Sequence, residues 1–228
     1  MSPVSRKRKQ PNKKKIIIVD DHPVLRRGLA ALIESEADLI VSGEAATCQA
    51  ALEVIQKNNA DLVLVDIELL GCHGLDLVKA MKIHHLTIPA LVLSMHEESV
   101  YAGRALRAGA RGYISKLQLD ETLLKAIRRV LDGEMYMSEK LLEQFAQKYI
   151  GGKSLQADTP VDVLSDRELQ VFRLIGQGRS TRQIGEALTL SIKTIESHAE
   201  HIKHKLTLTS APELAQRATQ WVETGHVK

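Results

Sequence analysis

The sequence is poor in aromatic residues, in cysteine and in long apolar runs. Phe, Trp and Tyr make up 3% of the 228 residues, so the core has to be built from Leu, Ile, Val and Ala. Cys48 and Cys72 are too few and too ill-spaced for a disulfide framework or a zinc site. This sparing use of cysteine fits a reducing cytoplasm, which is the expected location.

Long apolar segments are missing. The longest apolar runs, such as residues 16–19 and 62–65, are far shorter than the ~20 residues that cross a bilayer. The basic N-terminus is not followed by an apolar stretch of signal-peptide length. We therefore expect no association with a membrane and no secretion. The sequence also has no internal repeat, which argues against a repeat architecture.

Charge is distributed unevenly behind a net value of +3. The first fifteen residues carry seven Lys or Arg and no acid, whereas residues 16–159 sum to −5. Residues 160–228 carry nine basic and eight acidic side chains. We interpret residues 1–15 as a disordered basic arm, because they are polar, contain proline and repel one another. The arm precedes an acidic part and a faintly basic part.

From residue 16 onward, short apolar runs alternate with segments of helical pattern. The runs are continuously apolar, as in parallel strands that are covered on both faces. The pattern predicts an α/β fold, a doubly wound five-stranded parallel sheet of the flavodoxin-like kind. The expected strands are 16–19, 39–42, 62–65, 90–94 and 112–115, and the expected helices are 23–35, 47–58, 75–84, 97–108 and 120–133.

A separate all-α domain of four helices is expected after a linker. A helix over 138–149 is followed by two glycines and then by Pro160, so residues 133–159 are interpreted as the linker. The pattern over 160–228 is helical throughout. Helix starts are marked by three capping boxes and one further N-cap: Ser165 with Glu168, Ser180 with Gln183, Ser210 with Glu213, and Ser191.

Polar side chains are expected to meet at one edge of the sheet. Asp20 and Asp21 follow the first strand and Asp66 follows the third, and sites in doubly wound sheets form at the carboxyl ends of strands. Three nearby negative charges repel one another unless a cation joins them, and Mg²⁺ suits such oxygen ligands. Ser94 and Lys116, after the fourth and fifth strands, add a hydroxyl donor and a positive charge. Each side chain alone could simply cap a helix or face water, but the set supplies what phosphoryl transfer needs.

Residues 16–132 resemble the receiver domains of two-component response regulators. The matching segments are VDDHPVLRRGL (19–29), LVLVDIELLGCHGLDL (62–77), LVLSMHEE (91–98) and ALRAGARGYISK (105–116). The acidic pair, the lone Asp, the Ser and the Lys follow one another in the order of that family. The resemblance implies a protein that accepts a phosphoryl group and is not an enzyme in the usual sense, apart from slow self-dephosphorylation.

The resemblance also implies a role for each carboxylate. Asp66 would be the phosphoacceptor, a carboxylate nucleophile toward a phosphohistidine of a sensor histidine kinase. Asp21 would bind Mg²⁺ directly and Asp20 through water. Asp66 itself and the backbone carbonyl of Glu68 would complete the protein ligands of the ion.

Further positions of the receiver pattern carry over with two departures. Ser94 and Lys116 would contact the aspartyl phosphate, and the rotamer of Tyr113 would follow the Ser94 hydroxyl. Leu70 and Leu117 stand where many receivers have proline, which affects loop geometry and leaves the chemistry intact.

Two positions are those that tune the lifetime of the phosphate in this family. They lie two residues beyond the phosphoacceptor and two beyond the switch hydroxyl, and here they are Glu68 and His96. We hypothesise that this pair positions or excludes the hydrolytic water; the alternative is two solvated polar residues.

Residues 164–206 carry a second pattern. On a helix over 191–206, an apolar stripe lies opposite an exposed polar face; the stripe is Ile195, Ala199, Ile202 and Leu206, and the polar face is Lys193, Ser197, Glu200 and His204. A short helix over 181–188 precedes it through a tight turn. Two helices in this arrangement fit the major groove of DNA.

This segment resembles the LuxR-type helix-turn-helix of the NarL/FixJ group over residues 160–224. The matching positions are Glu168, Val171, Leu174, Gly178, Ser191, Lys193, Thr194, Ile195 and His198. The resemblance makes 191–206 the recognition helix. The candidate DNA contacts are Arg179, Arg182, Lys193, Thr194, Glu196, Ser197, Glu200, Lys203 and Lys205.

The faint basicity of the helical domain bears on how it would bind. Phosphate neutralisation supplies much of DNA affinity, so a monomer should bind weakly and a dimer should double the contacts. The resemblance implies that phosphorylation frees the recognition helix or promotes a homodimer on two half-sites of double-stranded DNA. The basic arm either adds nonspecific attraction to DNA or serves as a solubility tail.

Three other functions are weighed against this one. A haloacid-dehalogenase-like phosphatase also uses an Asp nucleophile, but its Asp-x-Asp motif follows the first strand, where the acids here are adjacent. An interaction protein whose receiver never takes phosphate would not need the intact set of Asp20, Asp21, Asp66, Ser94 and Lys116. RNA binding is disfavoured by the helix-turn-helix pattern.

Overall fold

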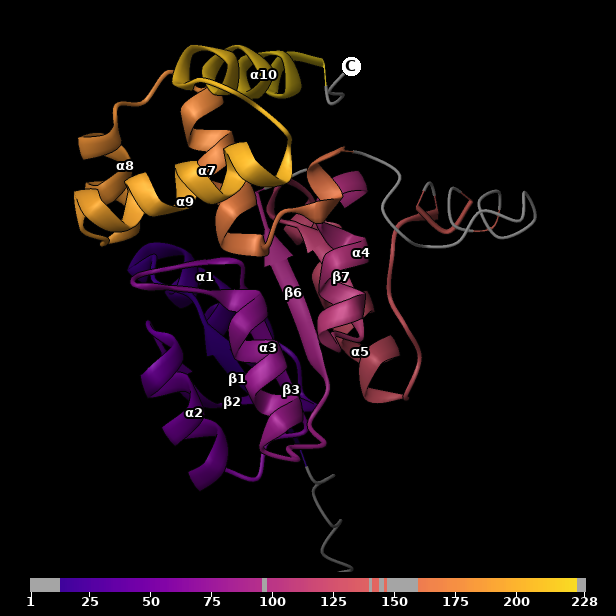
Figure 1. Cartoon of the computed structure of the whole chain (residues 1–228). Helices are drawn as coiled ribbons and strands as arrows, with labels where there is room; N and C mark the ends of the chain where they lie inside the picture. Colours follow the sequence, from indigo (N-terminus) through magenta and orange to yellow (C-terminus); the bar gives the residue numbers. More distant parts are fainter. Residues whose placement is uncertain (1–12, 96–97, 140, 144–145, 147–159, 225–228) are drawn as a thin grey trace, which may run out of the picture.

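A five-stranded parallel sheet forms the centre of the N-terminal domain (Figure 1). The computed structural model describes residues 13–95, 98–139, 141–143, 146 and 160–224. The strand order is β2-β1-β3-β6-β7 and all neighbours are parallel. The strands are β1 (Lys14–Val19), β2 (Leu39–Ala45), β3 (Leu62–Asp66), β6 (Ala90–Ser94) and β7 (Gly112–Ser115). The predicted doubly wound sheet is confirmed, with its change of direction between β1 and β3.

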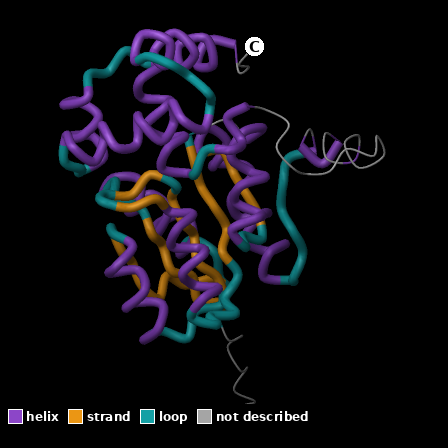
Figure 2. The backbone as a smooth tube through the Cα atoms, viewed as in Figure 1, coloured by secondary structure: helices purple, strands orange, loops and turns teal. Residues whose placement is uncertain are grey.

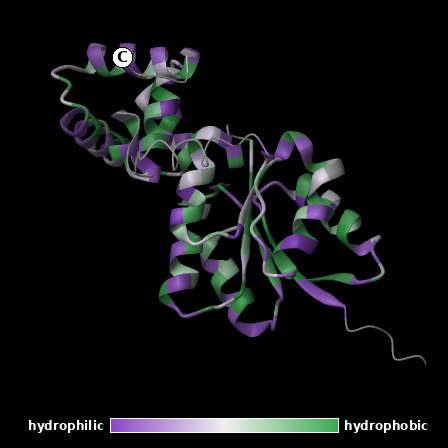
Figure 3. Ribbon diagram, turned by 90° about the vertical axis from the view of Figure 1, so that its right-hand side faces the viewer, coloured by the Kyte–Doolittle hydropathy of each residue, from purple (hydrophilic) through white to green (hydrophobic). Residues whose placement is uncertain are grey.

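Helices cover both faces of the sheet, as Figure 2 shows. They are α1 (Pro23–Glu34), α2 (Cys48–Lys57), α3 (Gly74–Ile83), α4 (Glu98–Ala108) and α5 (Leu119–Leu131). Side chains of a strand alternate between faces, so Ile16 and Ile18 pack with α1 and α5 while Ile17 and Val19 pack with α2, α3 and α4. All residues of β3 and β6 are buried. This burial explains the continuously apolar runs, which Figure 3 shows as green stretches along the strands.

The first strand begins two residues before its predicted start. The Lys14 N–H donates to the Asp38 carbonyl at 2.8 Å, and the Lys15 N–H donates to the Asp61 carboxylate at 2.8 Å. Lys14 Nζ lies 3.0 Å from the same carboxylate. These partners are distant in sequence, so charge alone wrongly assigned Lys14 and Lys15 to the arm. Residues 1–12 of the predicted arm lie outside the described residues.

A short antiparallel hairpin follows β3 and was not predicted. Its strands are β4 (Glu68–Leu69) and β5 (Cys72–His73), with Glu68 opposite His73 and Leu69 opposite Cys72. Gly71 in the turn has a φ of +75°, a conformation that favours glycine. We call this segment, residues 68–73, the hairpin.

The hairpin brings Cys72 to the N-terminus of α2, where it forms a disulfide with Cys48. The Cα atoms of the pair lie 6.3 Å apart and the two residues are separated by 24 positions in the sequence. The sequence argued correctly against a disulfide framework but did not anticipate this bond. The spacing of the two cysteines along the chain does not reveal the disulfide, because Cys72 reaches Cys48 only through the fold of the hairpin.

The C-terminal domain is helical, as predicted. It comprises the 3-10 turn η2 (Pro160–Val163) and the helices α7 (Asp166–Gly176), α8 (Thr181–Leu188), α9 (Ile192–Lys205) and α10 (Ala211–Thr224). The rings of Phe172 of α7 and Trp221 of α10 contact each other at a tilt of 50°, with centroids 5.8 Å apart. Two of the few aromatic residues of the chain are thus placed in its smaller core.

The predicted helix starts are largely confirmed. Both hydrogen bonds of a capping box are present at Ser165 and at Ser180, and the Ser191 hydroxyl accepts from Thr194 N–H. The third predicted box forms only in part. The Ser210 hydroxyl accepts from the Glu213 N–H at 3.3 Å, but the Glu213 carboxylate accepts from Thr209.

Two other expectations fall wholly or partly outside the described residues. The predicted helix over 138–149 is described only at residues 138, 139, 141–143 and 146, and the linker at 147–159 is not described. Within the part of the chain that is described, no helix combines the length and the apolar character needed to cross a bilayer.

Gly74, the first residue of α3, generates a stability prediction. A Cβ at this position would lie 1.9 Å from the Asp66 carbonyl oxygen, so the backbone must shift to admit it. We expect Gly74→Ala to lower the free energy of unfolding by about 1–3 kcal/mol or more. At Gly28, within α1, an added Cβ would meet no atom within 4 Å, so Gly28→Ala should be neutral or stabilising by about 0.5–1 kcal/mol. Urea unfolding compares the two, and equal effects would contradict the prediction.

Candidate functional site

Three carboxylates and a histidine meet at the carboxyl end of β1 and β3. One ligand atom from each of Asp20, Asp21, His22 and Asp66 lies within 4.8 Å of all the others. Asp20 and Asp66 are buried, being 1% and 3% exposed. His22 was not predicted, although it follows the acidic pair directly; its Nδ1 lies 2.8 Å from Asp21 Oδ1. The predicted meeting of Asp20, Asp21 and Asp66 is confirmed.

Lys116 joins two of these carboxylates. Its Nζ lies 2.7 Å from Asp20 Oδ2 and 2.7 Å from Asp66 Oδ2, and its side chain is 4% exposed. The residue follows β7, at the far side of β6 from β3. The long side chain of Lys116 therefore reaches across β6 to the two carboxylates. The sequence predicted that Lys116 lies at the same edge of the sheet, but not that it pairs with Asp20 and Asp66.

Burial sets the protonation of the cluster. It raises the pKa of Asp66 to about 7, against the lowering effect of Lys116. Burial also raises the pKa of Asp21, and the neighbouring Asp20 raises it further, while His22 lowers it. Burial by itself would lower the pKa of Lys116, but the charges of Asp66 and Asp20 raise it above its usual value. Loss of solvation, more than repulsion between the carboxylates, thus disfavours the charged forms of Asp21 and Asp66.

This donor set fits a hard divalent cation. The oxygen atoms come from three carboxylates, as Mg²⁺ prefers, and the raised pKa values of Asp21 and Asp66 indicate that a further positive charge would be favourable there. His22 stands beside Asp21 and offers one nitrogen. The residues present therefore suit the magnesium ion that the sequence suggested.

The other predicted site residues surround the cluster. Ser94 ends β6 and is 1% exposed, and Tyr113 on β7 is fully buried and hydrogen-bonded to Ser94. Burial raises the pKa of the Tyr113 hydroxyl. Tyr113 therefore points inward, toward Ser94. His96 lies outside the described residues.

Glu68 connects the cluster to the C-terminal domain. Its backbone N–H donates to Asp66 Oδ1 at 3.3 Å. Its carboxylate lies 2.5 Å from Arg173 Nη2 on α7. The sequence identified Glu68 but not this partner, because the two residues lie 105 positions apart.

A buried arginine forms the centre of the contact between the two domains. Arg104 on α4 is 7% exposed and donates to the Leu164 carbonyl at 2.8 Å, to Asp166 Oδ1 at 3.1 Å and to the Val161 carbonyl at 2.9 Å. Lys79 on α3 donates to Asp166 Oδ2 at 2.7 Å. We call the pairs made by Arg104, Lys79 and Glu68 with η2 and α7 the domain contact.

Asp166 is charged within the domain contact. Burial would raise its pKa, but the hydrogen bond from Lys79 and the nearby positive groups hold the pKa below its usual value. Apolar side chains of both domains also belong to one continuous cluster, which includes Leu75 of α3, Val161 and Leu164. No sequence pattern indicated this contact. Asp166 is the first residue of α7, where an acidic side chain is common for reasons local to the helix.

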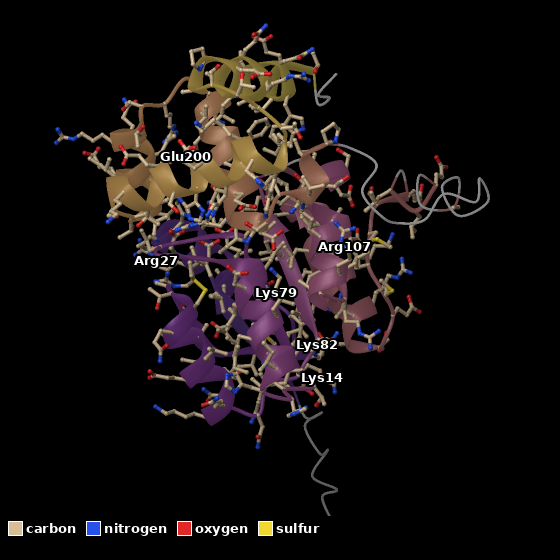
Figure 4. All side chains as sticks on the ribbon, in the orientation of Figure 1. Lys14, Arg27, Lys79, Lys82, Arg107 and Glu200 are labelled. Atoms are coloured by element: carbon tan, nitrogen blue, oxygen red, sulfur yellow. A yellow bond between two sulfur atoms is a disulfide. The ribbon has the colours of Figure 1, made fainter. Side chains whose placement is uncertain are left out.

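The polar face of α9 is exposed in this arrangement. Ile195 and Ile202 are buried, whereas Lys193, Glu196, Ser197, Glu200 and His204 are exposed. Arg179 and Arg182 are exposed as well, and Arg182 pairs with Glu186 at 3.0 Å. The two-sided helix expected from the sequence is confirmed, and Figure 4 shows Glu200 among the helices above the sheet.

Like Arg182, three further basic or hydroxyl-bearing candidate contact residues have partners within the C-terminal domain. Lys205 Nζ lies 2.6 Å from Glu168, whose side chain is 6% exposed, and Lys203 Nζ lies 2.9 Å from Glu200. Thr194 is hydrogen-bonded to Ser191 at the N-terminus of α9. These three side chains therefore contribute to the stability of the domain.

Comparison with known families matches both parts of the chain. Residues 16–128 match the response regulator receiver domain, and residues 162–218 match the bacterial regulatory proteins of the luxR family. The chain is 34% identical over 208 residues to the oxygen regulatory protein NreC of Staphylococcus haemolyticus (strain JCSC1435), with 90% of this chain and 96% of that protein covered. It is 36% identical to NreC of Staphylococcus aureus (strain JH9), with the same coverage.

Solved structures resemble much of the chain. RcsB from Salmonella enterica serovar Typhimurium, bound to promoter rprA in the presence of phosphomimetic BeF3-, has a TM-score of 0.59 at 25% identity over 90% of this chain and 98% of that chain. A LuxR-family two-component response regulator from Aurantimonas sp. SI85-9A1 has a TM-score of 0.57 at 30% identity over 61% of this chain and 99% of that chain. Another structure, at 25% identity and a TM-score of 0.55 over 90% of this chain and 97% of that chain, holds two RcsB dimers on two parallel DNAs.

The raised pKa of Asp66 generates a prediction about stability and pH. The folded state keeps a proton on Asp66 that the unfolded chain releases near pH 4, so this group makes the fold less stable as pH rises from about 4 to about 7. Asp66→Asn removes that penalty. We expect the variant to be more stable than wild type by roughly 1–3 kcal/mol at pH 8, since each pKa unit corresponds to about 1.4 kcal/mol.

The measurement is urea unfolding at pH 5 and pH 8 with a chelator present. The gain from Asp66→Asn should shrink at pH 5, where the wild-type carboxyl is already protonated. A gain of equal size at both pH values would show that burial does not raise the pKa of Asp66.

The domain contact generates a second prediction. Arg104→Ala removes three hydrogen bonds at a buried position. Asp166 then loses one of its two positively charged partners and keeps only Lys79. Breaking a buried ion pair costs about 3–5 kcal/mol, so the two domains should separate. Small-angle X-ray scattering should then show a larger maximum dimension. Lys82→Ala is the control, because Lys82 lies further along α3 from the C-terminal domain than Lys79 (Figure 4). An unchanged profile for Arg104→Ala would contradict the prediction.

Proposed function

Because the chain belongs to the response regulators that join a receiver domain to a LuxR-type DNA-binding domain, we propose that phosphoryl transfer to Asp66 switches its binding to DNA. As a member of this family it is a phosphorylation-regulated transcription factor of a two-component system, and not an enzyme in the usual sense. The observation that carries the proposal is the cluster of Asp20, Asp21 and Asp66 with Lys116 between two of the acids.

The transfer step assigns the nucleophile to Asp66. A carboxylate oxygen of Asp66 attacks the phosphorus of a phosphohistidine on a sensor histidine kinase, a P–O bond forms, and the P–N bond to the histidine breaks. Asp20, Asp21, Asp66 and the backbone carbonyl of Glu68 would hold Mg²⁺. When bound, this ion offsets the charge of the phosphoryl oxygens.

Lys116, Ser94 and Tyr113 would respond to the new phosphate. Lys116 now pairs with Asp66, so it stands where it can turn its ammonium group to a phosphoryl oxygen. Ser94 ends the neighbouring strand β6 and can donate its hydroxyl to another oxygen. That turn would change its hydrogen bond to Tyr113, so the rotamer of Tyr113 would follow the phosphate.

The domain contact offers a route from the phosphate to DNA. Glu68 holds Asp66 through its backbone and Arg173 through its side chain, so a shift at Asp66 reaches α7 through one residue. We infer that the contact restrains the C-terminal domain before phosphorylation and is weakened after it. Because the polar face of α9 is already exposed, the restraint would not act by covering the DNA-binding side chains. It would act on the orientation of the C-terminal domain and on its pairing with a second copy.

Binding to double-stranded DNA would use α9 in the major groove. Lys193, Arg179 and Arg182 are exposed and would contact phosphates, whereas Glu196, Ser197 and Glu200 would face base edges. Thr194, Lys203 and Lys205 would add contacts only if they exchange their present partners. The RcsB dimers on DNA support a homodimer on two half-sites after phosphorylation.

Further assignments complete the proposal. Residues 16–132 would form the receiver, 133–159 the linker and 160–228 the DNA-binding domain, next to the family matches at 16–128 and 162–218. A regulator of transcription works in the cytoplasm, where its DNA is, and needs no membrane. Slow self-dephosphorylation would involve Glu68 and His96, and one carboxylate oxygen of Glu68 is now paired with Arg173.

The decisive experiment selects DNA sequences with the phosphorylated and the unphosphorylated protein. Acetyl phosphate with Mg²⁺ supplies the phosphoryl group, and Asp66→Asn is the control. We expect a stable adduct on Asp66 and selection of a two-fold symmetric site with higher affinity. Turnover of acetyl phosphate without an adduct would favour a phosphatase. An adduct without any effect on DNA binding would favour an interaction protein, and enrichment of RNA over DNA would contradict the helix-turn-helix assignment.

Lys193 generates a prediction about salt dependence. If its ammonium group neutralises one phosphate, Lys193→Ala should weaken binding similarly for all DNA sequences and reduce the slope of log affinity against log salt by about 0.9 for each protomer that is bound. Lys57→Ala, at the exposed end of α2, should leave the slope unchanged. The slope comes from fluorescence anisotropy at several salt concentrations. No change in slope for Lys193→Ala would remove it from the interface.

A further inference from the structure

Cys48 and Cys72 stand next to the site without a role in the proposed chemistry. Cys48 is the first residue of α2 and Cys72 lies on β5, and both are half-buried. Their Cα atoms lie 6.3 Å apart, within the range of a disulfide, and the two sulfur atoms are bonded. The pair therefore links the hairpin to α2.

The hairpin is the segment to which the site and the domain contact are both attached. Leu69 pairs with Cys72, and the adjacent Glu68 holds Asp66 through its N–H and Arg173 through its carboxylate. Behind the hairpin, the Gly74 N–H donates to the Ile67 carbonyl at 2.7 Å. A covalent bond at Cys72 thus restrains the backbone that borders Asp66.

We propose that Cys48 and Cys72 are a reversible redox modification site, at which oxidation to the disulfide slows phosphorylation of Asp66. A phosphoryl group on Asp66 needs room where Lys116 and the Glu68 N–H now contact the carboxylate, and a movement of the hairpin backbone at Glu68 would provide part of that room. The disulfide restricts that movement and holds Glu68 against Arg173. The reduced thiols release it. This inference rests on the proposed function of Asp66.

A purely structural disulfide fits this chain less well. In the cytoplasm, glutathione and thioredoxin keep cysteine pairs reduced, so a disulfide persists there only when an oxidant is present. The half-buried position of both cysteines leaves them within reach of small oxidants and reductants. The N-terminus of a helix, where Cys48 lies, favours the thiolate form that reacts with them.

The oxidation is balanced with a peroxide as the oxidant. One thiolate sulfur attacks an oxygen of hydrogen peroxide, the O–O bond breaks, and hydroxide takes up a proton and leaves as water, so that a sulfenic acid remains. The second thiol attacks that sulfur, the S–S bond forms, and the sulfenic oxygen leaves as a second water. Two thiols thus lose two electrons and two protons. A cytoplasmic dithiol reverses the change by exchange and becomes a disulfide itself.

The test compares the full chain in its oxidised and reduced states. One sample is treated with hydrogen peroxide and the other with a phosphine reductant, and alkylation followed by mass spectrometry counts the free thiols. Both are then given acetyl phosphate and Mg²⁺, and the rate of adduct formation on Asp66 is measured by mass spectrometry. Cys48→Ser and Cys72→Ser, each treated with peroxide, are the matched controls.

We expect peroxide to form the Cys48–Cys72 bond and to slow adduct formation at least about fivefold, the lower end of typical coupling between sites. The serine variants should keep the rate of the reduced wild type. No disulfide, equal rates in the two states, or an equal slowing of the serine variants would each overturn the inference. The wild-type comparison remains valid even if a variant folds poorly.

Failure of the proposed function gives a different result. No adduct on Asp66 in either redox state would overturn phosphoryl transfer itself and the regulatory part of the inference with it. An adduct that forms equally fast in both states would overturn the inference alone.

Discussion

The structure depends on the burial of two carboxylates beside one ammonium group. Asp20 and Asp66 are almost inaccessible to water, and Lys116 lies 2.7 Å from an oxygen of each. Burial raises the pKa of Asp66 to about 7, so the cluster holds negative charge at a cost in stability. A divalent ion or a change in the position of Lys116 relieves that cost. In the proposed function, the phosphoryl group and its cation would bind at this edge of the sheet.

One residue, Glu68, contacts both the site and the second domain. Glu68 is the residue at which backbone and side chain point to different partners, Asp66 on one side and Arg173 on the other. Arg104 and Asp166 hold the remainder of the domain contact with buried, charge-assisted hydrogen bonds. The disulfide from Cys72 adds a covalent restraint to the hairpin between them.

Much of the fold followed from local pattern. The continuous apolar runs predicted a parallel sheet, and the serine N-caps at Ser165, Ser180 and Ser191 predicted three helix starts to the residue. Prediction failed where another partner, distant or local, competes with the expected one. Lys14 joins β1 through Asp38 and Asp61 in spite of its charge, and the carboxylate of Glu213 turns to Thr209 in place of Ser210.

The sequence by itself determined which side chains come together at the carboxyl edge of the sheet, because the strand ends place the acidic pair, Asp66 and Lys116 there. Hydrophobic periodicity likewise determined which face of α9 is exposed. Only the tertiary structure decided what these parts touch. The partners of Glu68, Arg104 and Cys48 lie 105, 62 and 24 residues away along the chain. Such pairings depend on how whole elements pack, and no local pattern of residues records that packing.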